Sequence, residues 1–330
     1  MIVRRAAALT LAGFAVLAGV VAAIAQEAPR PDQLVDALEG VFGKNPGMRR
    51  GHAKGFCVTG NFTPAPEAAS LSTAPHFTKP VSLIGRFSLG GGNPKAPDNA
   101  QDNVKGLALR FDLGDGAVTD LAMISAPIFF VPTPALFAEL LNTVKTGDKE
   151  KIGAFFAAHP EATRQKAWLM SHPIPASYAG VDYFGVHAFT FTNADGKTQL
   201  AKYRAVPDAG ELGLTPEEVT AKGPDFLQPE MEERLAKGPV SFELEALLGK
   251  DGDQTADPTL RWDDEDNRPV VMLGKVAIDK IAPDSTCSPF TFLPANLVDG
   301  IAGPSDDPVF AARSPAYVVS FTRRLSQPAQ

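Results

Sequence analysis

Short stretches that alternate apolar and polar residues recur from residue 52 onward, and they constrain the fold more than any other feature. Residues 80–91, 104–116 and 118–125 show this pattern, and glycine or Asn-Asp turns separate them. The stretch "GVHAFTFTNADGKTQLAKYRAV" predicts a β-hairpin around "NADGK", and residues 239–249 and 269–278 predict two more strands.

Helical periodicity occurs before and between these strands. It predicts helices at residues 31–42, 134–143, 149–158, 162–170 and 216–235. A run of strands, an inserted group of helices and further strands indicate an α+β fold with an antiparallel sheet. No internal repeat or linker divides the chain into separate domains.

The first 25 residues have the features of a signal peptide. "MIVRR" is a short basic start, residues 6–25 are uncharged and apolar, and Ala23-Ile24-Ala25 fits signal peptidase. We therefore predict a signal peptide at 1–25, a single domain at 26–330 and a periplasmic location. The length of the apolar run leaves an uncleaved anchor as the alternative.

Charge and cysteine content exclude several classes of partner and site. The formal charge of the chain is −7, and the predicted leader contains two arginines and no acidic residue, so the mature domain carries −9. This charge argues against nucleic acid or an anionic membrane as partner. Two cysteines, Cys57 and Cys287, are too few for a disulfide framework or a four-ligand zinc site. They form either one bridge, which an oxidising compartment permits, or two buried thiols.

A tyrosine lies between arginines in "AARSPAYVVSFTRRL" near the end of the chain. With a helical period, Arg313, Tyr317 and Arg324 fall within about 40° of one another on one face. Nearby positive charge favours the phenolate form of a tyrosine. The alternative interpretation is an amphipathic helix with basic residues in its last turn, where they suit the helix dipole.

Further arginines and aromatic residues occur upstream. "MRRGHAKG" contains Arg49 and His52, a predicted strand ends with "RFS", and "APIFFVPTPALF" precedes a predicted helix. These aromatic residues suit a hydrophobic core, but the whole set also suits haem. Arginines would hold the propionates, apolar rings would cover the macrocycle, the phenolate would bind ferric iron, and the histidine would move protons.

These stretches resemble the haem-containing catalases, and in particular the smaller exported catalase-related peroxidases. The resemblance extends from about Arg49 to Arg324 and follows the order of the family. It is carried by "RRGHAKG", "RFS", "APIFF", "FGVHAF", "LGKVAI", "FLPANLVDGI" and "RSPAYVVSFTRRL". It implies an antiparallel eight-stranded β-barrel with surrounding helices, without the C-terminal helical domain of full-size catalases. Closure of such a barrel would bring Cys57 and Cys287 together.

The resemblance also implies a role for each matching residue, with one haem b per chain as the cofactor. Tyr317 matches the iron ligand, Arg313 its hydrogen-bonding partner, and His52 the distal acid/base that Ser88 orients. The propionate-binding arginines and the rings near the haem are matched by Arg49, Arg86, Arg324, Phe130 and Phe137. His187 matches a structural histidine remote from the distal site.

The sequence departs from the family pattern at three positions near the predicted site. Ser125 stands where family catalases have an asparagine that presents an amide to peroxide, and we expect it to affect catalysis there. Gly51 replaces a branched apolar residue next to the distal histidine, and Lys105 replaces an arginine. These changes should weaken the oxidation of a second peroxide, so that an organic donor can compete as reductant.

The predicted function is therefore a haem-dependent peroxidase with weak catalase activity. It would reduce hydrogen peroxide or organic peroxides with a small organic electron donor. The alternatives are a minimal-size true catalase and a haem-binding protein without peroxide turnover, although simple carriage of haem needs no distal acid/base. We expect no nucleic-acid partner, no stable membrane association, and a monomer or dimer.

Overall fold

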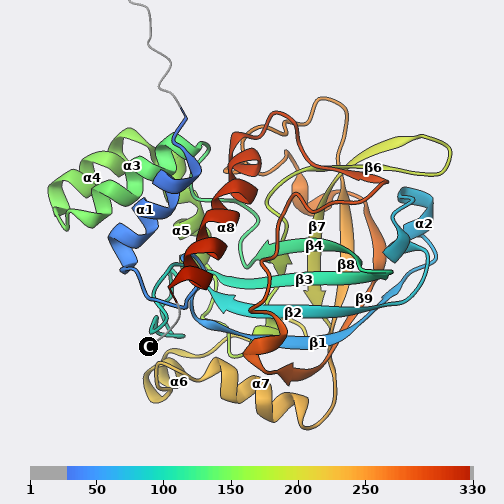
Figure 1. Cartoon of the computed structure of the whole chain (residues 1–330), viewed down its shortest axis with the longest axis horizontal. Helices are drawn as coiled ribbons and strands as arrows, with labels where there is room; N and C mark the ends of the chain where they lie inside the picture. The colour runs from blue at the N-terminus through green and yellow to red at the C-terminus, as the bar shows by residue number, and fades with distance from the viewer. Residues whose placement is uncertain (1–27, 328–330) are drawn as a thin grey trace, which may run out of the picture.

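The computed structural model describes residues 28–327, and the predicted signal peptide at 1–25 lies outside this range. Over the described residues, none of the helices has the length and hydropathy needed to cross a membrane. Figure 1 shows a β-barrel on one side, a group of helices on the other, and the last helix between them.

Eight antiparallel strands close the barrel. In barrel order they are β1 (Gly55–Pro64), β2 (Val81–Leu89), β3 (Lys105–Gly114), β4 (Ala117–Ile124), β5 (Tyr183–Phe184), β7 (Thr198–Pro207), β8 (Val240–Leu248) and β9 (Val270–Ala282). The β1–β9 and β7–β8 pairings complete the circle, which leaves these strands without free edges. The α+β class and the eight-stranded barrel predicted from the sequence are confirmed.

One position of the barrel is shared between two short strands. β5 pairs with Arg204 and Ala205 of β7, and β6 (Phe189–Thr192) pairs with the part of β7 from Thr198 to Ala201. β10 (Ile301–Ala302) extends the sheet beyond β6. The hairpin predicted around "NADGK" is β6–β7.

Helices lie outside the barrel, as Figure 1 shows. They are α1 (Pro31–Phe42), α2 (Ala68–Leu71), α3 (Pro134–Lys145), α4 (Lys149–Ala158), α5 (Arg164–Met170), α6 (Pro216–Ala221), α7 (Leu227–Leu235) and α8 (Pro308–Ser326). α1 and α4 have the predicted bounds, and the predicted C-terminal helix lies within α8. Helix α8 continues through Pro315 and contacts both α1 and α3.

One prediction about local structure was wrong. The helical pattern at 216–235 forms two helices, α6 and α7, because Gly223-Pro224 interrupts it. Cys287 follows the short 3-10 turn η5 (Asp284–Thr286), and the next strand is β10.

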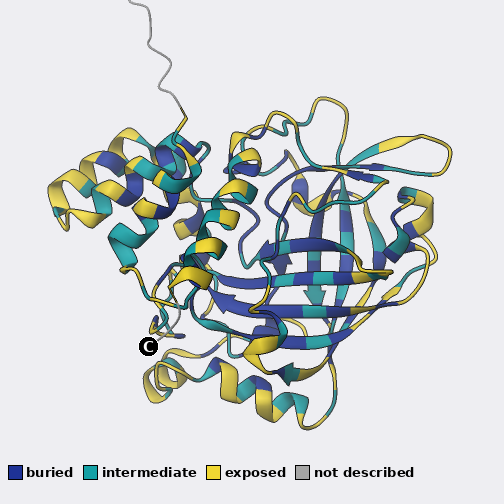
Figure 2. Ribbon diagram, viewed as in Figure 1, coloured by how far each residue is buried: buried dark blue, intermediate teal, exposed yellow. Residues whose placement is uncertain are grey.

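The cores of the barrel and of the helical group are separate. Alternate side chains of the strands fill the barrel with aromatic and aliphatic groups, and Figure 2 shows these strands as largely buried. A second apolar cluster joins α3 and α4 and includes Leu140 and Phe155. The functional site lies where α8, α1 and α3 approach strands β2, β3 and β4.

Candidate active site

A cavity of about 620 Å³ lies between these strands and helices. This volume is in the range of sites that bind a cofactor or small molecule. Its lining includes all but one of the residues predicted for the site: Arg49, His52, Arg86, Ser88, Phe130, Phe137, Arg313, Tyr317 and Arg324. The tertiary structure therefore brings together residues that are up to 275 positions apart in the sequence.

His52 and Ser88 form a hydrogen-bonded pair at the barrel wall. His52 Nδ1 lies 3.0 Å from Ser88 Oγ. Gly106 of β3 lies opposite Ser88 in the sheet, and its missing side chain leaves the space that both groups occupy. When Nδ1 carries the proton and Ser88 accepts it, Nε2 is left with a lone pair.

The backbone of His52 is held in an uncommon conformation. Its φ of 55° lies in the left-handed region, which costs on the order of 1–3 kcal/mol for a residue other than glycine. Arg86 donates hydrogen bonds to the carbonyl oxygens of His52 (2.9 Å) and Ala53 (3.1 Å), which fixes this turn. Desolvation inside the cavity, followed by repulsion from Arg86, Arg313 and Arg49, lowers the pKa of His52 to about 4. The imidazole is therefore neutral at neutral pH and can accept a proton.

Three guanidinium groups meet at one end of the cavity: those of Arg49, Arg86 and Arg324. Their hydrogen bonds run to backbone carbonyl oxygens. Within residues 28–327, no carboxylate lies within ion-pair distance of any of them. The Nε of Arg324 is buried and lacks a hydrogen-bond partner among the described residues.

The electrostatics of this cluster favour an anionic ligand. Burial, followed by repulsion from Arg86 and Arg324, lowers the pKa of Arg49 to about 8. Burial lowers the pKa of Arg86 to about 10 and also lowers that of Arg324. A bound dianion would offset both the desolvation and the mutual repulsion.

Tyr317 belongs to a chain of hydrogen bonds on the α8 side of the cavity. Arg313 donates to Tyr317 Oη (2.9 Å) and contacts His187 Nε2 (2.9 Å), while His187 Nδ1 contacts Asp307. A guanidinium can only donate, so His187 Nε2 accepts and the imidazole proton lies on Nδ1, toward Asp307. Burial lowers the pKa of His187, which agrees with a neutral ring. Tyr317 Oη accepts a hydrogen bond from Arg313, and its other lone pair remains free to bind a group in the cavity.

Apolar side chains make up much of the remaining wall. Phe130 and Phe137 have ring centroids 5.6 Å apart, and both line the cavity together with Phe129. The apolar face of α1 contributes Leu38 and Phe42. Apolar walls, a cluster of cations and an oxygen ligand in one cavity fit a haem, with the cations at its propionates.

Ser125 does not lie in this cavity. Its Oγ accepts a hydrogen bond from the backbone N–H of Lys105 (2.9 Å), and it lines a second, smaller cavity of about 60 Å³. Lys105 is buried beside it and donates through Nζ to the carbonyl oxygen of Asn103 (3.0 Å). We expected Ser125 to affect catalysis at the place where family catalases present an amide to peroxide, but its side chain lies outside the main cavity, because a serine is short enough to fold back onto the strand end.

Several groups of the site were not predicted from the sequence. The carbonyl oxygens of Cys287, Ser288 and Phe290 hold two of the arginines, and no side-chain pattern marks a carbonyl. Asp307 had a usable signal, because an Asp-Pro pair is typical of a helix start. It does cap α8, and its second oxygen contacts His187.

Comparisons with known proteins agree with this geometry. A family model described as "Catalase" matches residues 42–330. The chain belongs to the catalase family. A catalase-related peroxidase of Synechococcus elongatus is 39% identical over 303 residues, covering 89% of this chain and 88% of that protein. A catalase-related peroxidase of Mycolicibacterium paratuberculosis is 37% identical over 302 residues, covering 89% of this chain and 94% of that protein.

Solved catalase structures share the fold. A fungal catalase superposes with a TM-score of 0.74 at 22% identity, covering 84% of this chain. The alignment spans 59% of that catalase, so this chain corresponds to about three fifths of its length. Catalase-family proteins bind haem, and the cavity described above has the residues to hold one.

Proposed function

We propose that this chain is a haem peroxidase that reduces hydrogen peroxide or organic hydroperoxides with small organic electron donors, and that it has weak catalase activity. One observation carries the proposal: the His52–Ser88 pair, the Arg313–Tyr317 pair and three cationic side chains line one cavity. The two relatives named catalase-related peroxidases, which match over most of their length, support it.

The residues divide into those that hold the cofactor and those that move protons. Arg49, Arg86 and Arg324 would bind the propionates of one haem b, and Tyr317 would be the iron ligand, with Arg313 stabilising its phenolate. When bound, the haem would supply the redox-active iron. Phe130 and Phe137 would exclude water from the macrocycle.

His52 would act as the acid/base toward peroxide. Its neutral ring would accept a proton at Nε2 from one peroxide oxygen and return it to the other, so that water or an alcohol leaves. The hydrogen bond with Ser88 keeps the ring oriented for both steps. A simple haem carrier would have no use for this pair.

An open space beside His52 supports the reduction by organic donors. Gly51 lines the cavity, and a Cβ at this position would have no neighbour within 4 Å. A donor or a bulky hydroperoxide would find room there. The serine at position 125, turned away from the cavity, provides no amide to hold a second hydrogen peroxide as reductant.

We also place the protein in the periplasm, as a monomer or dimer. The basic start, the apolar segment and the Ala-Ile-Ala site support export. The bond between Cys57 and Cys287 supports an oxidising compartment.

The deciding experiment compares oxygen release with donor oxidation. Purified protein should show the visible spectrum of a ferric haem with a phenolate ligand. With hydrogen peroxide and a phenolic donor, it should oxidise much more donor than the oxygen it releases. Vigorous oxygen release with little donor oxidation would instead identify a small catalase, and a protein without bound haem would refute the proposal.

Gly51→Val tests the proposed donor access. Valine would fill the open space without a clash, so oxidation of bulky donors should fall several-fold while the reaction with hydrogen peroxide changes little. Gly153→Ala, on the exposed side of α4 with no neighbour within 4 Å of its new Cβ, is the matched control and should retain both activities.

A further inference from the structure

The disulfide between Cys57 and Cys287 joins two parts of the chain that frame the cationic end of the cavity. Cys57 lies near the start of β1, opposite Arg86 of β2. Cys287 lies just beyond β9, and the two Cα atoms are 6.0 Å apart across a sequence separation of 230 residues. Both cysteines are 1% exposed. The bond therefore ties the segment that follows β9 to the first barrel strand.

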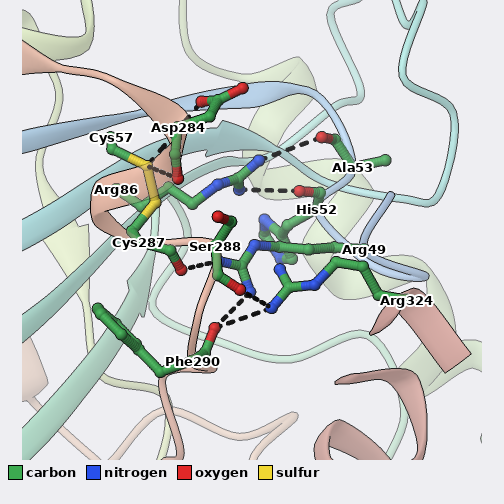
Figure 3. The surroundings of a disulfide bond; sticks show 10 residues. All are labelled: Arg49, His52, Ala53, Cys57, Arg86, Asp284, Cys287, Ser288, Phe290 and Arg324. Atoms are coloured by element: carbon green, nitrogen blue, oxygen red, sulfur yellow. Dashed lines mark hydrogen bonds between the residues drawn. A yellow bond between two sulfur atoms is a disulfide. The ribbon is translucent and has the colours of Figure 1, made fainter. Parts of the chain in front are cut away.

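That segment supplies the carbonyl oxygens that orient two of the three arginines (Figure 3). Cys287 O accepts from Arg49 (2.9 Å), and Ser288 O accepts from Arg324 (2.8 Å). Phe290 O accepts from Arg324 (2.9 Å) and Arg49 (3.4 Å). The third guanidinium, that of Arg86, comes from the residue that pairs with Cys57 in the sheet.

These carbonyl oxygens are well placed only while their backbone is fixed. Between β9 and β10, residues 283–300 contain only the 3-10 turn η5, so no strand or helix holds Ser288 or Phe290. Apolar packing provides part of the anchoring, because Phe292 clusters with both cysteines and the Phe290 ring lies 3.9 Å from the guanidinium of Arg110. The disulfide is the covalent anchor of this segment.

The arginines need such an anchor because they repel one another. Without an anion, three guanidinium groups close together would move apart and toward water. Hydrogen bonds to the carbonyl oxygens of residues 287–290 oppose this movement. They restrain the arginines only as far as the backbone of residues 287–290 is itself held in place.

We propose that the Cys57–Cys287 disulfide is a positioning element of the haem site, which fixes the carbonyl oxygens that aim Arg49 and Arg324 at the propionates. This inference rests on the proposed function, because it assigns the three arginines to a haem. It predicts that the bond contributes to haem retention through the propionates, in addition to its effect on stability.

The test compares natural haem with its dimethyl ester, whose propionates carry no charge. The full-length mature chain and the Cys57→Ser/Cys287→Ser variant are loaded with each form, and haem loss to an excess of apomyoglobin is followed by absorbance. The control is Leu273→Ala, a core substitution on β9 that lowers stability and leaves the arginine cluster intact. If the serine pair does not fold, Cys57→Val/Cys287→Ala replaces it and keeps the apolar cluster packed.

We expect the disulfide variant to lose natural haem about 10-fold faster than both wild type and Leu273→Ala. This factor corresponds to charge-assisted hydrogen bonds to the propionates that are weaker by about 1.4 kcal/mol. All three proteins should lose the dimethyl ester at similar rates. Equal loss of natural haem from the disulfide variant and Leu273→Ala, or an equal acceleration for natural haem and ester, would overturn the proposal. If wild type itself retains neither form, the proposed function fails; if wild type retains haem and oxidises donors but the variant matches it, only the positioning role fails.

Discussion

Gly106→Ala should disable the distal pair without removing any functional group. Gly106 lies opposite Ser88 in the β2–β3 ladder. A Cβ at this position would lie 2.7 Å from Ser88 Oγ, 2.9 Å from His52 Nδ1 and 3.0 Å from His52 Cε1. Ordinary van der Waals contact begins at 3.4 Å, so Ser88 Oγ must retreat by about 0.7 Å and the His52 ring by about 0.5 Å. The 3.0 Å hydrogen bond between them would lengthen or break.

The expected effect is large on the reaction rate and moderate on stability. Misplacement of a catalytic group by about 1 Å can cost about 100-fold, so a shift of half that size should slow the reaction with hydrogen peroxide by about 10- to 100-fold. Overpacking of this kind costs about 1–3 kcal/mol of folding free energy. Haem content should be unchanged, because Gly106 is not among the residues assigned to hold the cofactor.

Stopped-flow absorbance of the ferric enzyme mixed with hydrogen peroxide measures the rate, and thermal unfolding measures the stability. Gly153→Ala is the control, because the same substitution on α4 meets no atom within 4 Å and should gain about 0.5–1 kcal/mol. If Gly106→Ala reacts at the wild-type rate with its haem content and fold intact, the geometry of the His52–Ser88 pair does not govern the reaction.

Three further predictions concern the ligand, the acid/base and the barrel core. Tyr317→Phe should abolish haem retention, whereas Arg313→Leu should retain haem with a shifted visible spectrum; identical spectra and haem content in both would contradict the assignment. His52→Ala should lower the rate with hydrogen peroxide by about 100-fold, and the wild-type rate should fall as pH drops through about 4, where His52 becomes protonated; a rate that stays constant to pH 3 would exclude His52 as the base. His76 is stacked on Phe111 in the barrel, and burial lowers its pKa to about 3, so the unfolded chain takes up a proton below pH 6.5 while the folded chain does not. His76→Phe should therefore lose less stability between pH 6.5 and 4 than wild type, by about 1.4 kcal/mol per pH unit, as urea unfolding at several pH values would measure; parallel pH dependences would contradict this.

Local patterns in the sequence determined most of the secondary structure. Alternation and turn residues are properties of neighbouring positions, and they predicted the β6–β7 hairpin and strands β2, β3, β4, β8 and β9. Helical spacing likewise placed Arg313 and Tyr317 one turn apart, and the structure joins them by a hydrogen bond of 2.9 Å. The family resemblance added the barrel and the identities of the arginines, which local periodicity does not contain.

The tertiary structure alone decided how the site is supported. Whether Cys57 and Cys287 are bonded depends on the position of a segment that has almost no secondary structure of its own. Every residue has a backbone carbonyl oxygen, so no residue type indicates which carbonyls bind side chains. The sequence therefore did not show that the carbonyls of residues 287–290 bind Arg49 and Arg324. Ser125 shows the same limit: its match to the asparagine of family catalases suggested a role in catalysis, but its side chain accepts a hydrogen bond from the backbone of Lys105 and lies outside the cavity. Sequence determines which groups are available, whereas contacts between distant segments determine where those groups point.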